Sequence, residues 1–176
     1  SMTGDDTILS VASIMVTTNM AAAAGAVTTM LLTWVKYGKP DVSMTLNGGL
    51  AGLVAITAGT DVVSVAGSFW IGVIAGIAIV YAVEFVDQKM KIDDPVGAIS
   101  AHGVCGALGT ILTGVFSVKD GLLYTGNPHF LLIQVLGVVV VALYVFVAIN
   151  IVFRIIKATN GLRVTREEAV SYTHLT

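Results

Sequence analysis

Five long stretches of this chain are apolar and almost free of charge, and they constrain its fold more than any other feature. The stretches are residues 8–35, 44–60, 62–85, 96–116 and 130–153. Each is near or above the roughly 20 residues that a helix needs to cross the hydrocarbon core of a bilayer. Glu84 is the only formally charged residue inside them. Because charged residues make up only 11% of the 176 positions, polar surface is too scarce to cover a water-soluble globule.

These stretches predict an all-α polytopic membrane protein. A segment that crosses lipid must satisfy its own backbone N–H and C=O groups, and the stretches lack the polar/apolar alternation of a membrane β-barrel. We therefore predict a membrane domain over residues 8–158 with about five transmembrane helices, after a stub, 1–7, and before a tail, 159–176. Stretch 44–60 is short and contains Asn47 and several glycines. A tilted or partly irregular helix is the alternative there, but we count this stretch as crossing.

Basic residues follow every second stretch and predict the orientation. Eight of the nine lie on one side: Lys36, Lys39, Lys89, Lys91, Arg154, Lys157, Arg163 and Arg166. The opposite side carries Lys119 and several aspartates. The positive-inside rule then places the N-terminus outside and the C-terminus in the cytoplasm, as an odd number of spans requires.

Small residues recur at helical spacing within the stretches and predict close helix packing. They are Gly48, Gly52, Gly72, Gly76, Gly97, Gly103, Gly106, Gly109 and Gly114. Such residues let backbones approach where lipid provides no hydrophobic drive, so we favour packing over ligand binding for them. For Thr17 and Asn19 we favour hydrogen bonds across helices over lining a path. Three further residues stay unassigned: Ser68, Trp70 and Thr110.

His102 is the residue that points to function, since it lies inside stretch 96–116, about six residues from its cytoplasmic end. A neutral imidazole offers one hydrogen-bond donor and one acceptor to a passing polar molecule. Ionisable residues at membrane depth are costly and tend to line pathways. A histidine that is satisfied by a carbonyl or hydroxyl of a neighbouring helix is an equal alternative. His129 follows Asn127 and Pro128, and we expect it in a turn at the membrane interface.

Residues 93–106 read DDPVGAISAHGVCG. This segment resembles the signature of Amt-type ammonium transporters of the Amt/Mep/Rh family, in which a DDP cap precedes HGVCG. Further matches follow the family's order: Gly38-Lys39-Pro40, residues 47–57, and Gly161-Leu162-Arg163-Val164. The resemblance covers residues 10–168 and implies the last five of eleven helices, one half of an inverted-repeat transporter.

The resemblance implies that ammonium gives up its proton and passes as ammonia along a narrow apolar pore with two central histidines. His102 matches the second histidine. Ala98 matches a pore-lining position, although packing is the simpler explanation for an alanine. Asp93 and Asp94 precede the helix that carries His102, and we predict that they cap its N-terminus at the cytoplasmic face.

The chain departs from the family pattern because the first five or six helices have no counterpart in it. We expect transport by this half alone to be incomplete, since the family's pore lies between two halves. The functions in view are therefore ammonium transport as the C-terminal half of a transporter, an ammonium sensor or regulatory module on the same scaffold, and an inactive membrane fragment. The family also implies a homotrimer and a PII-type regulator at the cytoplasmic face, with Lys89, Lys91 and residues 161–168 as contacts.

Other function classes lack a supporting pattern. Cys105 is the only cysteine, and the histidines stand 27 and 45 positions apart, so we expect no disulfide, metal site or cofactor. We expect neither enzymatic catalysis nor nucleic-acid binding. Ser1-Met2 is typical of a cloning remnant, and for residues 171–176 a cloning origin is as plausible as a biological one.

Overall fold

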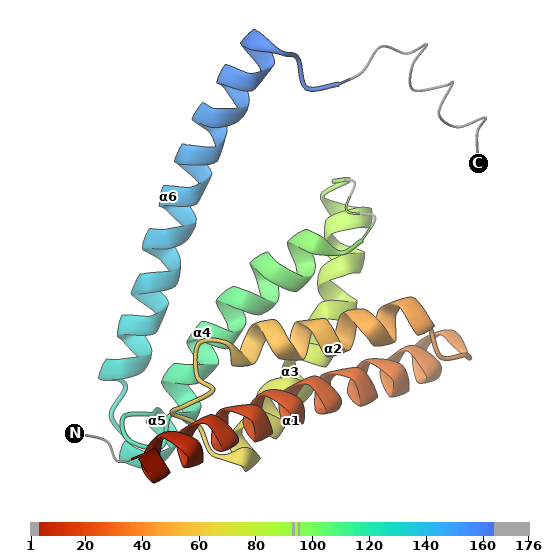
Figure 1. The fold of residues 1–176 in the computed structure, drawn as a ribbon. Coiled ribbons are helices and arrows are strands. Elements are labelled where there is room, and N and C mark those ends of the chain that lie inside the picture. Colours follow the sequence, from red (N-terminus) through yellow and green to blue (C-terminus); the bar gives the residue numbers. More distant parts are fainter. Residues whose placement is uncertain (1–3, 93, 95, 164–176) are drawn as a thin grey trace. The chain divides into compact units, whose positions relative to one another are not determined.

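The computed structural model describes residues 4–92, 94 and 96–163, and the chain forms two units whose boundary falls after Val138. The regular secondary structure of the described residues is helical, and it contains no strand beyond one isolated bridge between Val63 and Ser117 (Figure 1). In chain order the elements are α1 (Gly4–Tyr37), α2 (Val42–Ile56), α3 (Val65–Glu84), the π-helix η1 (Phe85–Lys89), the π-helix η2 (Ile99–Val104), α4 (Cys105–Phe116), α5 (Leu122–Thr125) and α6 (His129–Thr159). The all-α prediction is confirmed.

The helix boundaries follow from local chemistry. Asp41 accepts a 2.8 Å hydrogen bond from the Met44 N–H and caps α2, and Ser64 accepts a 3.0 Å bond from the Gly67 N–H and caps α3. Gly38, at φ 78°, ends α1 in the left-handed conformation that a residue without a Cβ adopts most readily.

Four described stretches are long and apolar enough to cross a bilayer: Ile8–Tyr37, Val65–Lys89, Ile99–Phe116 and His129–Thr159. The second predicted span differs, because its helix α2 has 15 residues and residues 57–60 form a turn. At 1.5 Å per residue this helix is about 22 Å long, shorter than the roughly 30 Å hydrocarbon core. The apolar helices support a polytopic membrane protein, in which α2 is shorter than the four candidate spans.

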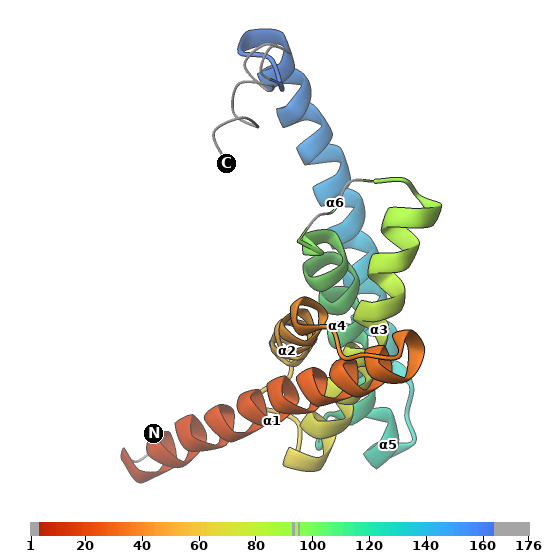
Figure 2. The same cartoon turned by 90° about the vertical axis from the view of Figure 1, so that its right-hand side faces the viewer.

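Helices α1, α2 and α3 of the first unit pack side by side at their small residues (Figures 1 and 2). A Cβ added at Gly52 would lie 2.2 Å from the carbonyl oxygen of Ala21, and one at Gly72 would lie 2.3 Å from the same oxygen. At Gly48 an added Cβ would meet the Thr29 side chain at 2.2 Å. Close packing at these glycines is therefore confirmed, because a methyl group has no room there.

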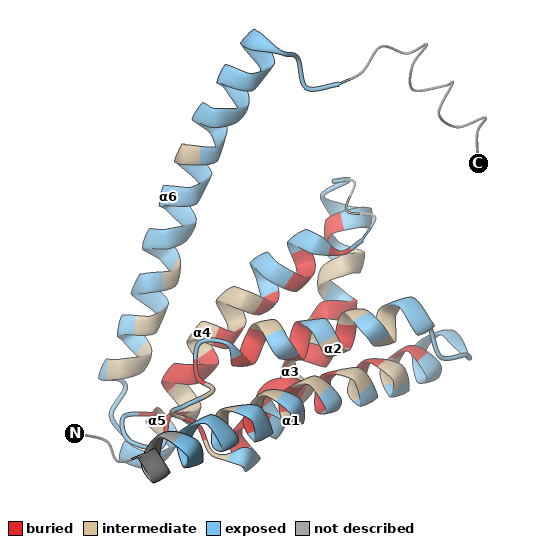
Figure 3. Cartoon of the chain, in the orientation of Figure 1, coloured by how far each residue is buried: buried red, intermediate tan, exposed pale blue. Residues whose placement is uncertain are grey.

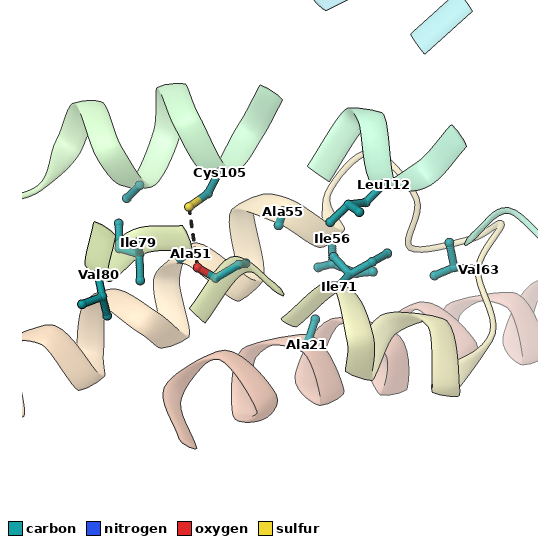
Figure 4. Close-up of a cluster of buried hydrophobic side chains, with 12 residues drawn as sticks. Ala21, Ala51, Ala55, Ile56, Val63, Ile71, Ile79, Val80, Cys105 and Leu112 are labelled. Carbon is teal, nitrogen blue, oxygen red and sulfur yellow. Dashed lines mark hydrogen bonds between the residues drawn. The ribbon is translucent and has the colours of Figure 1, made fainter. Parts of the chain in front are cut away.

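The buried residues of the first unit lie where these helices face one another and where α4 joins them (Figure 3). Ile56, Ile71 and Ile79 are fully buried in this core, together with Ala55 (Figure 4). Cys105 also points inward, with its Sγ 3.9 Å from the carbonyl oxygen of Ala75. Because the Cys105 side chain points into the core, the opposite face of α4 does not contribute to this core contact.

Two threonine hydroxyls bridge separate segments. Thr17 donates to the carbonyl oxygen of Thr60 at 2.8 Å, as predicted, and Thr29 donates to that of Gly76 at 2.8 Å. Asn19 differs from the prediction, because its amide donates to the Met15 carbonyl of its own helix at 2.8 Å. Its side chain is exposed, so it spans no helix–helix contact among the described residues.

Glu84, the one charge inside the apolar stretches, has partners at the ends of α1 and α3. Lys36 Nζ lies 2.6 and 2.5 Å from its two carboxylate oxygens, and the Tyr37 hydroxyl donates to it as well. The same ammonium group lies 4.5 Å from the ring centroid of Tyr81. These contacts offset part of the cost of a carboxylate near the edge of the membrane.

The contact between α2 and α4 depends on Gly109, where an added Cβ would lie 2.1 Å from the carbonyl oxygen of Ala55. We expect Gly109→Ala to lower the free energy of unfolding by about 1–3 kcal/mol, because the backbone atoms of Ala55 cannot move aside as the tip of a side chain can. The measurement is the midpoint of thermal unfolding in detergent, followed by circular dichroism.

Gly137→Ala is the matched control, since nothing lies within 4 Å of a Cβ at that helical position. Its midpoint should stay unchanged or rise slightly, given the better helix propensity of alanine. Equal midpoints for the two variants would contradict the packing argument.

Candidate functional site

His102 lies in η2, a single π-helical turn that continues into α4. The Cys105 N–H donates to the carbonyls of His102 and Ser100, so the backbone register changes where η2 meets α4. Gly97 precedes the turn at φ 67° and is buried beside Asn47. Isolated π-helical turns are rare and are found frequently at functional sites.

Asp94 holds the beginning of this turn. Its carboxylate accepts hydrogen bonds from the backbone N–H groups of Ile99, at 3.1 and 3.2 Å, and of Ser100, at 3.3 Å. The Ser100 hydroxyl also lies 3.4 Å from the carboxylate. The carboxylate thus satisfies free N–H groups of the first turn from outside the N-cap position, which Ala98 occupies, and its negative charge complements the helix dipole. Asp93, the other predicted capping residue, lies outside the described residues.

The imidazole of His102 faces an open groove, which we call the His102 groove, with a volume of about 470 Å³. Six residues line it: Val54, Thr57 and Ala58 from α2 and the turn after it, and His102, Gly106 and Thr110 from η2 and α4. His102, Gly106 and Thr110 are spaced four residues apart and so share one helix face. The groove is mostly apolar, with a few polar groups placed along it.

His102 is exposed, and among the described residues no side chain or backbone group forms a hydrogen bond with its imidazole. The alternative in which a neighbouring helix satisfies this histidine therefore has no support in the described part of the chain. Its two nitrogens are available to a molecule in the groove.

The glycines of the fourth span serve two different purposes. Gly109 and Gly114 make close contacts, with Ala55 and Leu131, as the packing prediction requires. A Cβ added at Gly106 would lie 3.6 Å from Val54, and one at Gly103 would lie 4.0 Å from Ile99. Both distances are ordinary contacts, so Gly103 and Gly106 are not needed for close packing. At Gly106 the missing side chain keeps the groove wide beside His102.

Ala98 is exposed and is not among the residues that line the His102 groove. Its predicted role at the pore stays a prediction. The sequence analysis missed Thr57 and left Thr110 unassigned. The spacing of eight residues between His102 and Thr110 is the signal that could have placed Thr110 on this face.

The sequence profile of the Ammonium Transporter Family matches residues 1–174. This chain belongs to that family. Ammonium transporter Amt2 of Archaeoglobus fulgidus is 43% identical over 163 residues, which are 86% of this chain and 34% of the relative. The ammonium transporter of Aquifex aeolicus is 39% identical over 159 residues, 88% of this chain and 37% of the relative. The chain thus spans about a third of the length of these curated relatives.

Solved structures of family members are similar to the fold. The structure titled Sensor Amt Protein matches with a TM-score of 0.84 and 37% identity over 90% of this chain and 40% of that chain. Mep2 of Candida albicans matches with a TM-score of 0.77 and 27% identity over 89% of this chain and 37% of that chain. The helical arrangement is therefore that of part of an Amt/Mep protein.

Among residues 4–92, 94 and 96–163, no three histidine, cysteine, aspartate or glutamate side chains come together as a metal site. The polar groups of the His102 groove are one imidazole and two hydroxyls. This arrangement can donate and accept hydrogen bonds along an otherwise apolar surface, which suits binding or passage of a small polar molecule.

Removal of the Asp94 carboxylate should loosen the turn that carries His102. We expect Asp94→Ala to cost about 0.5–2 kcal/mol, the usual effect of losing an N-terminal cap. Amide hydrogen exchange in detergent should then become faster at Ile99 and Ser100, and stay unchanged in α2.

Asp41→Ala is the matched control, because the Asp41 carboxylate also accepts a hydrogen bond from a first-turn amide, the Met44 N–H of α2. This variant should speed exchange in the first turn of α2 and leave η2 unaffected. If both variants changed the same amides, Asp94 would have no specific role in holding η2.

Proposed function

We propose that this chain is the C-terminal half of an ammonium transporter that moves ammonium or ammonia across the cytoplasmic membrane. The observation that carries this proposal is the exposed imidazole of His102 in an apolar groove within a membrane-length helix. Membership of the Ammonium Transporter Family and the titles of the relatives, which are ammonium transporters, support it. The proposed activity is passage of a substrate and not a chemical conversion.

The apolar lining opposes a bare cation, because a charge at membrane depth costs several kcal/mol or more. Ammonium can avoid this cost by giving up a proton, and the imidazole of His102 can hydrogen-bond the resulting ammonia or relay a proton. Potassium has no proton to lose and would have to be dehydrated in full. Selectivity for ammonium over potassium follows from this difference.

The groove is open in this chain, and a complete pore requires a second wall. In transporters built from inverted repeats the path lies between two halves. We therefore expect the described helices to conduct only after they assemble with the half that the longer relatives contain. Under the same proposal the N-terminus is outside and the C-terminus is cytoplasmic, as the basic residues indicate.

The same proposal includes two associations: with further copies of the chain, as a trimer, and with a PII-type regulator. Lys89 and Lys91 follow α3 on the proposed cytoplasmic side and carry positive charge for such a contact. The third predicted contact, residues 161–168, lies beyond the described residues from position 164 onward.

A sensor is the second candidate function. The observation that favours it is the match to the structure titled Sensor Amt Protein. A sensor would bind ammonium through the same His102 groove and change a signalling partner without net transport.

Flux measurements in proteoliposomes test the transport proposal. The chain, reconstituted with the N-terminal half, should show ammonium-dependent flux. His102→Ala should lower that flux by about 2- to 10-fold, as expected from loss of one hydrogen bond of about 0.5–1.5 kcal/mol. His129→Ala is the matched control, since His129 is an exposed residue at the beginning of α6 and outside the groove.

Flux from the chain alone would mean that copies of it complete the path themselves. Saturable ammonium binding that depends on His102, without flux in either arrangement, would favour the sensor. Absence of both flux and binding would rule out transport and sensing for this chain, and the inactive fragment would remain.

A further inference from the structure

Thr110 lies on the same helix face as His102, eight residues further along, and lines the same groove. At 1.5 Å per residue this spacing corresponds to about 12 Å along the helix. Its hydroxyl donates to the carbonyl oxygen of Gly106 at 3.0 Å. A threonine hydroxyl has a single proton, so this bond commits the only donor that Thr110 has.

The hydroxyl oxygen keeps lone pairs that can accept a hydrogen bond. Thr57 lines the groove from the opposite wall. Its only donor is also committed, because its hydroxyl donates to the Leu53 carbonyl at 2.8 Å. At these two positions the groove therefore presents oxygen atoms that accept and do not donate. A guest with N–H donors fits such positions, whereas a guest that only accepts does not.

Thr113 shows that the bond to the helix backbone alone does not make a site. Its hydroxyl donates to the Gly109 carbonyl at 3.0 Å, as that of Thr110 does to Gly106. Yet Thr113 is only 3% exposed, and a Cβ added at Gly59 would lie 2.7 Å from its hydroxyl oxygen. Thr113 is thus a packing residue with the same local geometry, and Thr110 differs by facing the open groove.

We propose that the Thr110 hydroxyl oxygen is a substrate subsite, which accepts a hydrogen bond from an N–H of ammonium or of a small primary amine. This inference rests on the proposed transport function and adds a second contact in the same groove, separate from that at His102. In the proposed orientation Thr110 lies on the outer side of His102, so a guest from outside reaches it first. The two hydroxyl oxygens replace only a small part of the hydration shell of potassium, but each satisfies one N–H of ammonium.

The test is the concentration dependence of ammonium flux in proteoliposomes that hold the chain together with the N-terminal half. Thr110→Val keeps the shape of the side chain and removes the acceptor. It should raise the half-saturating ammonium concentration by about 2- to 10-fold, as expected for one lost hydrogen bond. Thr110→Ser restores the hydroxyl and should return the half-saturating concentration to that of the unchanged chain.

Thr113→Val is the matched control, because it removes a hydroxyl from the same helix and leaves the groove lining intact. It should lower the thermal midpoint without changing the half-saturating concentration. If Thr110→Val failed to fold, Thr110→Ala would be measured in its place, with the same expected rise.

Parallel measurement of His102→Ala separates this inference from the proposed function. Flux that depends on His102 but shows an unchanged half-saturating concentration in Thr110→Val would overturn the subsite and leave transport in place. Absence of flux from the unchanged assembly would overturn transport, and the subsite with it.

Discussion

Close approach of helix backbones is the constraint on which the rest of this structure depends. Lipid tails are as apolar as these helices, so the hydrophobic effect does not drive the helices together. They associate through van der Waals packing and hydrogen bonds. Helix α2 has backbone contacts on two sides, with Ala21 of α1 through Gly52 and with α4 through Ala55 and Gly109. Because both contacts involve backbone atoms, α2 has little freedom to shift. Its position in turn sets the wall of the His102 groove that Val54 and Thr57 form.

The same helix, α4, both packs closely and leaves space. Gly106 and Gly109 lie about one turn apart on α4, but they meet different parts of α2. Gly109 meets the backbone of α2, whereas Gly106 opens onto the groove beside His102. Cys105 occupies a third direction and is buried toward α3. One short segment thus fixes α4 against α2 and α3 and also borders the open groove next to His102.

The sequence predicts the helical class, the approximate spans and the family, because long uncharged stretches and the segment 93–106 are strong signals. It does not predict that α2 ends at Ile56, since residues 57–60 carry no charge and no proline that would mark the end of a helix. Nor does it predict the π-helical turn at His102, because hydrogen-bond register depends on the contacts of both flanking segments. Thr110 stays unassigned for another reason: hydropathy describes a whole helix, and packing shows that the face with His102 and Thr110 remains open.

The threonine hydroxyls of this protein differ in the carbonyl to which they donate and in whether they line the groove. Thr17 and Thr29 donate to carbonyls of other segments, and both are buried, so their hydroxyls hold the fold together. Thr57 and Thr110 donate within their own helices and face the groove. Because these two hydroxyls line an open groove, their lone pairs are available to a guest. Exposure to the groove, together with the direction of the proton, therefore distinguishes Thr57 and Thr110 from Thr113, whose hydroxyl also donates within its own helix but is buried.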